Sequence, residues 1–145
     1  MKIVVLKFGG SSVGTIEKIK KVANIIKEHR KKNYRVIVVS SAMSGVTNEL
    51  ISKSREISNN FSDEEYDVLV SSGEQVSCSL IAGRLIHNGI KSRSWLAWQM
   101  PIFTEGYHKN SRIVQIYKSN ILEFLKEGGI PIITGFQGIN NKNRV

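Results

Sequence analysis

Apolar and polar positions along the chain follow two periods, and together these predict alternating strands and helices. Short apolar runs predict strands at about 2–7, 35–40, 93–97, 112–117 and 130–134. Apolar residues at spacings of three and four predict helices at about 15–31, 46–58, 74–87 and 119–126. The stretch that contains Pro101 and Gly106 is expected to be loop with short extended pieces.

The strand residues also indicate how the sheet is built. Val36, Ile37, Val38 and Val39 form a continuous β-branched run, which is typical of a strand covered on both faces. Repetition of strand, helix and strand then favours α/β architecture: a three-layer α/β/α sandwich around a mostly parallel sheet. The last strand leads into a polar run at 140–144 without a closing element, so the fold is expected to be incomplete at the C-terminus.

Local signals refine the predicted helix ends. Thr15 is the expected N-cap of the first helix, and Asn88-Gly89 is a C-terminal stop signal. Ser62-Asp63-Glu64-Glu65 has the spacing of a capping box ahead of another apolar stretch.

Length and composition predict one globular domain. The chain has 145 residues, of which 41% are hydrophobic and 23% charged. No apolar run approaches the ~20 residues that cross a bilayer, and the run after Met1-Lys2 is too short for a secretory signal. Cys78 is the single cysteine, so no disulfide can form within the chain. These features predict a cytoplasmic protein.

The net charge of +9 raises nucleic acid as a partner. A nucleic-acid-binding module needs basic residues on one face, with aromatic residues that stack on bases. Here the basic residues are spread along the chain, and the densest group, within 18–32, falls on one predicted helix and its end. A solvated helix face accounts for them better, and a basic nucleic-acid-binding module stays a remote alternative.

The first candidate site is Lys7-Phe8-Gly9-Gly10, where the first predicted strand ends. Ligands of open α/β sheets gather at the carboxyl ends of the strands. Gly9 and Gly10 lack Cβ atoms, so their N–H groups can approach a phosphate closely, and Lys7 adds a positive charge. A tight turn beside a solvated lysine explains the same residues, and spacing alone does not separate the two readings. Neither the Walker A nor the Rossmann pattern is present.

Polar residues also follow the second predicted strand and precede a later helix. Ser41, Ser44 and Thr47 lie close to a helix N-terminus, a natural place for carboxylate or phosphate oxygens, although a single helix cap would explain one of them. Glu74 is placed by the same pattern in the first turn of a helix. There it is either a partner of the helix dipole or, beside an anion-binding loop, a receptor for the ammonium group of an amino acid.

The other chemistry-bearing residues give weaker signals. His108 lies in a polar loop and could line a site, whereas His29 and His87 are expected to be structural or solvated. Cys78 falls within a predicted helix and is expected to be a small core residue. No metal-ligand spacing stands out, so no metal site is predicted.

Four motifs, in order along the chain, resemble those of one family. Residues 7–13 resemble the KFGG[ST]S signature of aspartokinases, and residues 41–48 resemble their serine-rich loop that ends in GxTN. Ser72-Gly73-Glu74 is similar to their SxGE, and Gly135-Phe136-Gln137-Gly138 is similar to a GFxG that follows a strand. The resemblance covers essentially the whole chain and implies the amino acid kinase fold.

The resemblance also implies a reaction. ATP phosphorylates the side-chain carboxylate of L-aspartate to give 4-phospho-L-aspartate, the first step toward lysine, threonine, methionine and, in bacteria, diaminopimelate. By resemblance, the residues that hold the transferred phosphoryl group of ATP are Lys7, Phe8, Gly9 and Gly10, with Lys7 as the catalytic residue. By the same resemblance, Ser41 and Thr47 contact aspartate and Glu74 binds its ammonium group.

The sequence departs from the family at its end. Aspartokinases continue past the GFxG motif into a glycine-rich LGRGGSD-type segment that binds the nucleotide and helps to place Mg²⁺, and regulatory ACT domains usually follow. Residues 1–145 are therefore expected to be the N-terminal, amino-acid-binding portion of the kinase domain. The implied cofactors are ATP and Mg²⁺, with the Mg²⁺ site outside this chain, and negligible aspartate-dependent ADP production is expected from the chain alone.

Two alternatives share this ancestry: a catalytically inactive truncated fragment and one half of a split aspartokinase. The expected partners are the small molecules L-aspartate and ATP, without nucleic acid or membrane, and a homo-oligomer or a complementing C-terminal half stays open. Relatives that act on glutamate, acetylglutamate, carbamate or UMP are the enzymatic rivals. The combination of KFGGSS, GxTN and SxGE favours aspartate over them.

Overall fold

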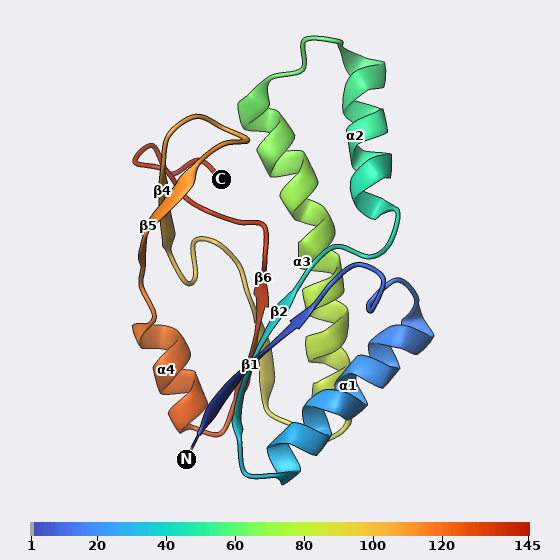
Figure 1. Ribbon diagram of the computed structural model, residues 1–145, viewed down its shortest axis with the longest axis vertical. Coiled ribbons are helices and arrows are strands. Elements are labelled where there is room, and N and C mark those ends of the chain that lie inside the picture. The colour runs from blue at the N-terminus through green and yellow to red at the C-terminus, as the bar shows by residue number, and fades with distance from the viewer. Residues whose placement is uncertain (1) are drawn as a thin grey trace.

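The computed structural model describes residues 2–145 and contains a four-stranded parallel sheet (Figure 1). In order across the sheet, its strands are β1 (Ile3–Phe8), β2 (Arg35–Ser40), β6 (Ile130–Thr134) and β3 (Ser92–Trp95). Every neighbouring pair runs parallel, as the strand–helix repetition predicts. Strand β1 lies at one edge of this sheet, and its side chains alternate in burial: Ile3 and Val5 are exposed, whereas Val4 and Leu6 pack against an apolar cluster.

Helices cover both faces of the sheet (Figure 1). Helices α1 (Ile16–Lys31) and α3 (Asp63–His87) pack on one face and α4 (Ser119–Lys126) on the other, while α2 (Val46–Ile57) packs against α3. The three-layer arrangement predicted from the sequence is confirmed. Among the helices of residues 2–145, none is long and apolar enough to cross a membrane.

Two apolar clusters, one on each face, hold the layers together. In β2, Val36 and Val38 are buried toward α1 and α3, whereas Ile37 and Val39 pack against the cluster beneath α4. This alternation is the physical reason for the continuous β-branched run, because both faces of the strand are covered. The α1 and α3 residues of the first cluster are Ile19, Val22, Ala23, Ile26, Cys78, Ile81, Ala82 and Leu85.

Helix α3 is longer than the sequence pattern predicts. It begins at Asp63 and runs for 25 residues, whereas the pattern predicts a helix only from Glu74. Ser62 occupies the N-cap position, but its side chain makes no capping hydrogen bond. Placement of Glu74 in the first turn of a helix is therefore wrong, and with it the reading of Glu74 as a partner of the helix dipole.

Small polar residues are the reason why the sequence pattern does not predict α3 as one continuous helix. Ser71 and Ser72 interrupt the apolar period, yet their hydroxyls donate to the carbonyl oxygens of Val68 and Leu69 at 2.9 and 2.6 Å. Serine hydroxyls that bond back to the preceding turn are satisfied inside a helix, so a serine pair need not end one.

The stretch around Pro101 contains a two-stranded ribbon. Strand β4 (Ile102–Glu105) pairs antiparallel with β5 (Arg112–Ile116), so the predicted strand at 112–117 is confirmed and the extended pieces before it are β4. Ile139 ties this ribbon to the segment after β6, because its N–H donates to the Ile102 carbonyl oxygen at 2.8 Å. Its own carbonyl oxygen accepts from the N–H of Thr104 at 3.0 Å.

Candidate functional site

Three parallel strands end at one level, and their following loops leave the sheet side by side. Phe8 is in register with Ser40, and Ser40 is in register with Thr134. Just beyond them, the N–H of Ser41 donates to the Phe8 carbonyl oxygen at 3.0 Å, and the N–H of Gly135 donates to the Ser40 carbonyl oxygen at 3.1 Å. Strand register thus brings together motifs that are far apart in the sequence.

A cavity of about 540 Å³ lies at this edge of the sheet, and we call it the substrate cavity because residues that the sequence predicts to bind the substrate line it. Residues from the loops after β1, β2 and β6, from the loop between β4 and β5, and from α2 and α3 line it. Four residues singled out from the sequence are among them: Gly10, Ser41, Thr47 and Glu74. The other lining residues are Ala42, Met43, Tyr66, Val70, Lys109 and Phe136.

Glu74 is the buried acidic group of the substrate cavity. Its side chain is 7% exposed, and one carboxylate oxygen accepts a hydrogen bond from the N–H of Phe136. Burial raises the pKa of the Glu74 carboxyl above its ordinary value, and the N–H groups of Phe136 and Gly135 and the charge of Lys7 offset part of that rise. A partly desolvated carboxylate facing a cavity is a receptor for a cation.

The glycine pair after β1 has two different surroundings. A Cβ on Gly10 would lie 2.9 Å from the Ala42 carbonyl oxygen, so the approach of this loop to the loop after β2 requires glycine. A Cβ on Gly9 would meet no atom within 4 Å. Neither glycine has the positive φ of a left-handed turn, so neither the backbone conformation nor a neighbouring atom requires glycine at position 9. The open space beside Gly9 leaves room for a bound group.

Lys7 and Phe8 lie beside the substrate cavity and do not line it. Lys7 is exposed on β1, close enough for its charge to act on the carboxyl of Glu74. The Phe8 side chain belongs to the apolar cluster under α1 and α3. The roles predicted for Lys7, Phe8 and Gly9 in binding phosphate stay predictions.

A serine pair pins the loop after β2 to α3. The Ser77 hydroxyl donates to the Ser41 carbonyl oxygen at 2.7 Å and lies 3.3 Å from the Ser40 hydroxyl. Ser40 and Ser77 are both fully buried. Sequence reasoning did not single out Ser77, whose position one turn after Glu74 on α3 is the signal that could have found it.

Helix α3 presents a row of residues to the substrate cavity. Tyr66, Val70 and Glu74 are spaced by four and therefore share one helix face. Tyr66 and Val70 were not predicted as site residues, because the sequence pattern predicts a helix that begins only after them. Lys109 was not predicted as a site residue, because no pattern in the polar loop before β5 indicates where its side chain lies.

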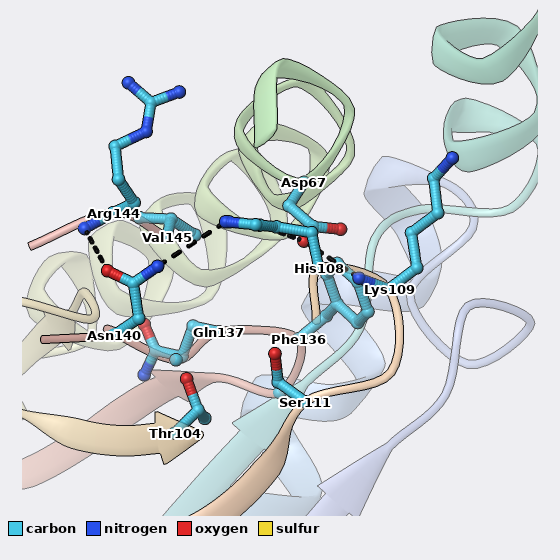
Figure 2. A pocket seen from close by; sticks show the side chains of 12 residues that line it. Asp67, Thr104, His108, Lys109, Ser111, Phe136, Gln137, Asn140, Arg144 and Val145 are labelled. Atoms are coloured by element: carbon cyan, nitrogen blue, oxygen red, sulfur yellow. Dashed lines mark hydrogen bonds and ion pairs between the residues drawn. The ribbon is translucent and has the colours of Figure 1, made fainter. Parts of the chain in front are cut away.

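A second cavity of about 170 Å³ adjoins the first, with Lys109 and Phe136 lining both. His108 lines this second cavity, as Figure 2 shows, between Asp67 and Asn140. The Nδ1 atom of His108 lies 2.7 Å from the carboxylate of Asp67, and both side chains are largely buried. His108 thus lines the second cavity and not the substrate cavity, and its place in a binding site stays a prediction. Over residues 2–145, no group of three or more His, Cys, Asp or Glu side chains is placed to hold a metal ion.

Comparison with known proteins gives a consistent picture. The amino acid kinase family model matches residues 2–145. Among curated proteins, an aspartokinase of Rickettsia conorii is 48% identical over the whole chain, and one of Geobacillus stearothermophilus is 46% identical. The chain spans only 37% and 36% of the lengths of these two relatives.

Solved structures share the fold. The crystal structure of an aspartate kinase from Synechocystis matches 96% of the chain with a TM-score of 0.80 and 37% identity, and the match covers 22% of that protein. Aspartokinase III of E. coli, solved in complex with aspartate and ADP, matches 99% of the chain with a TM-score of 0.85. The match covers 42% of that protein at 22% identity, so this second likeness bears on the fold alone.

Proposed function

The chain belongs to the amino acid kinase family, and from that premise we propose that it forms the amino-acid-binding part of an aspartokinase. Its proposed reaction transfers the γ-phosphoryl group of ATP to the side-chain carboxylate of L-aspartate. Aspartokinase relatives at 40–48% identity over the whole chain support this assignment above other members of the family. Because the chain spans about a third of those relatives, the activity of the whole protein is part of the proposal.

Glu74 carries the proposal. It is a buried carboxylate with a raised pKa, it faces a cavity, and it forms no ion pair with any group of residues 2–145. A buried carboxylate without a cation is unfavourable, and the ammonium group of an amino acid removes that cost on binding. Ser41 and Thr47 line the same cavity and supply hydroxyl groups to the carboxylates of the ligand.

The phosphoryl group enters from the side of β1. In the proposal, the amides of Gly9 and Gly10 and the ammonium of Lys7 hold the transferring γ-phosphoryl group, next to the end of the cavity that Gly10 lines. The attacking carboxylate of aspartate is already ionised at neutral pH, so the reaction needs no general base. Positioning and charge stabilisation then provide most of the catalysis of phosphoryl transfer.

Mg²⁺, which ATP-dependent phosphoryl transfer uses, finds no set of ligands among residues 2–145. Glu74 is the one carboxylate that lines the substrate cavity, and one carboxylate does not make a Mg²⁺ site.

Thermal-shift titration with L-aspartate, L-glutamate and UMP tests the assignment. L-aspartate should raise the melting temperature of the chain more than L-glutamate or UMP at equal concentration. Glu74→Gln should abolish the shift, because an amide does not neutralise an ammonium group. Equal shifts with all three ligands, or an unchanged response of Glu74→Gln to aspartate, would refute the assignment.

A further inference from the structure

A second charged residue, Lys109, lines the substrate cavity. Of the ten residues that line this cavity, Glu74 and Lys109 are the charged ones. They come from different parts of the fold, Glu74 from α3 and Lys109 from the loop between β4 and β5. An α-amino acid carries an ammonium group and a carboxylate on the same carbon, so its two charges require opposite partners in one cavity.

The backbone of Lys109 is held in place. Its φ is +67°, in the left-handed region that non-glycine residues occupy only when their surroundings impose it. Its N–H donates to the Asp67 carboxylate at 3.1 Å, and the ring of His108 binds the same oxygen. Asp67 is itself 7% exposed on α3. A buried carboxylate therefore clamps this loop against the helix that also carries Glu74.

The side chain of Lys109, in contrast, is held only loosely. Its ammonium pairs with Asp63 and lies 4.5 Å from the ring centre of Tyr66, which also lines the substrate cavity. Figure 2 shows this side chain extending away from the second cavity. Half-exposed ion pairs contribute little stability, so the ammonium can leave Asp63 for another carboxylate at low cost.

We propose that Lys109 is an additional substrate-binding residue, which exchanges Asp63 for the α-carboxylate of L-aspartate. This inference rests on the proposed function. The order of the strands suggests which carboxylate of the ligand each residue contacts. Gly10 follows the edge strand β1. Lys109 lines both cavities together with Phe136, which follows β6, and β6 lies on the other side of β2 from β1. The side-chain carboxylate faces the Gly10 end for phosphoryl transfer, which leaves the α-carboxylate for Lys109.

Calorimetric titration of the chain with L-aspartate tests the inference with three variants. Lys109→Met should weaken binding about fivefold, the size of a half-exposed ion pair. Asp63→Asn should leave binding unchanged or tighten it, because it releases Lys109. The matched control is Lys91→Met: Lys91 also pairs with a carboxylate, Glu127 at 2.6 Å, and lies 5.4 Å from an aromatic ring, that of Phe124, outside the substrate cavity. The control variant Lys91→Met should bind aspartate as tightly as the unsubstituted chain.

Two analogues identify the carboxylate involved. L-asparagine keeps the α-carboxylate, so Lys109→Met should weaken its binding by a similar factor. The α-amide of L-aspartate lacks that carboxylate, so its binding should not respond to the substitution.

The outcomes separate the two proposals. Normal aspartate binding by Lys109→Met, or equal losses in Lys109→Met and Asp63→Asn, would overturn the role of Lys109 and leave the proposed function standing. If Lys109→Met bound the α-amide more weakly but bound L-asparagine normally, the inference would also be overturned, because Lys109 would then contact the side-chain carboxylate. Failure of the unsubstituted chain to bind aspartate would refute the proposed function, and this inference with it.

Discussion

Gly73 packs α3 against the loop that carries Ser41 and against α2, which carries Thr47, and its replacement by alanine tests this packing. A Cβ at Gly73 would lie 3.0 Å from Val46 Cγ1, 3.2 Å from the Ala42 Cβ and 3.3 Å from Leu50 Cδ1. All three distances are tighter than ordinary van der Waals contact, so α2 and the preceding loop must move away from α3.

Gly83 provides the matched control, because it lies in the same helix with nothing within 4 Å of an added Cβ. Alanine is favoured over glycine inside a helix by about 1 kcal/mol, so Gly83→Ala should stabilise the chain by about that amount. Gly73→Ala gains the same propensity but loses about 1–3 kcal/mol to overpacking. The difference between the two variants isolates the packing and should be about 1–3 kcal/mol in the free energy of unfolding.

Urea denaturation followed by circular dichroism measures both free energies under one condition. Gly73→Ala should also bind L-aspartate more weakly than Gly83→Ala, because the displaced loop carries Ser41 and the displaced helix α2 carries Thr47. Equal stability of the two variants, within about 0.5 kcal/mol, would refute the close packing of α2 and α3 at Gly73.

Three further substitutions or treatments have defined outcomes. The raised pKa of Glu74 means that the folded chain binds a proton more tightly than the unfolded chain, so stability falls as pH rises through the range in which Glu74 ionises. The free energy of unfolding of Glu74→Gln should therefore rise relative to that of the unsubstituted chain as the pH increases from ~4 to ~7. A difference between the two chains that stays constant with pH in urea melts would contradict this. Asp67→Ala removes the acceptor for His108 and for the N–H of Lys109 and should cost about 2–4 kcal/mol in urea melts, whereas no loss would disprove the clamp. Burial raises the pKa of Cys78 to about 12, so a thiol reagent should label it only after unfolding; rapid labelling of the folded chain would contradict its burial.

Periodicity predicted much of the fold because the two sheet faces are covered by amphipathic helices and the strands are covered on both sides. The predicted ranges of β2, α4 and β6 agree with the structure, and α1 begins directly after its predicted cap Thr15. Glycine or serine signals next to each of these elements coincide with the ends of apolar runs, so local chemistry and burial point to the same boundaries.

Periodicity failed where tertiary contacts, not local pattern, decide the structure. The first half of α3 has polar residues at Ser71 and Ser72 that bond within the helix, so the pattern predicts a break that does not exist. Strand β4 is short and depends on its pairing with β5 and on Ile139, which lies far along the chain.

The candidate site was predicted as far as it consists of strand-end motifs. Parallel strands bring their carboxyl ends to one edge, so Gly10, Ser41 and the loop after β6 could be grouped from the sequence. Tyr66 and Lys109 could not, because their places depend on where α3 begins and on the clamp that Asp67 provides.

A crystal structure of the chain with L-aspartate is the most direct test of the central claim, that the cavity between the strand ends and α3 binds this amino acid. Aspartate is expected in the cavity of about 540 Å³, with its ammonium group on Glu74 and its side-chain carboxylate toward Gly10. Aspartate bound at another place, or bound here with its ammonium group away from Glu74, would show that this cavity does not bind the amino acid as proposed.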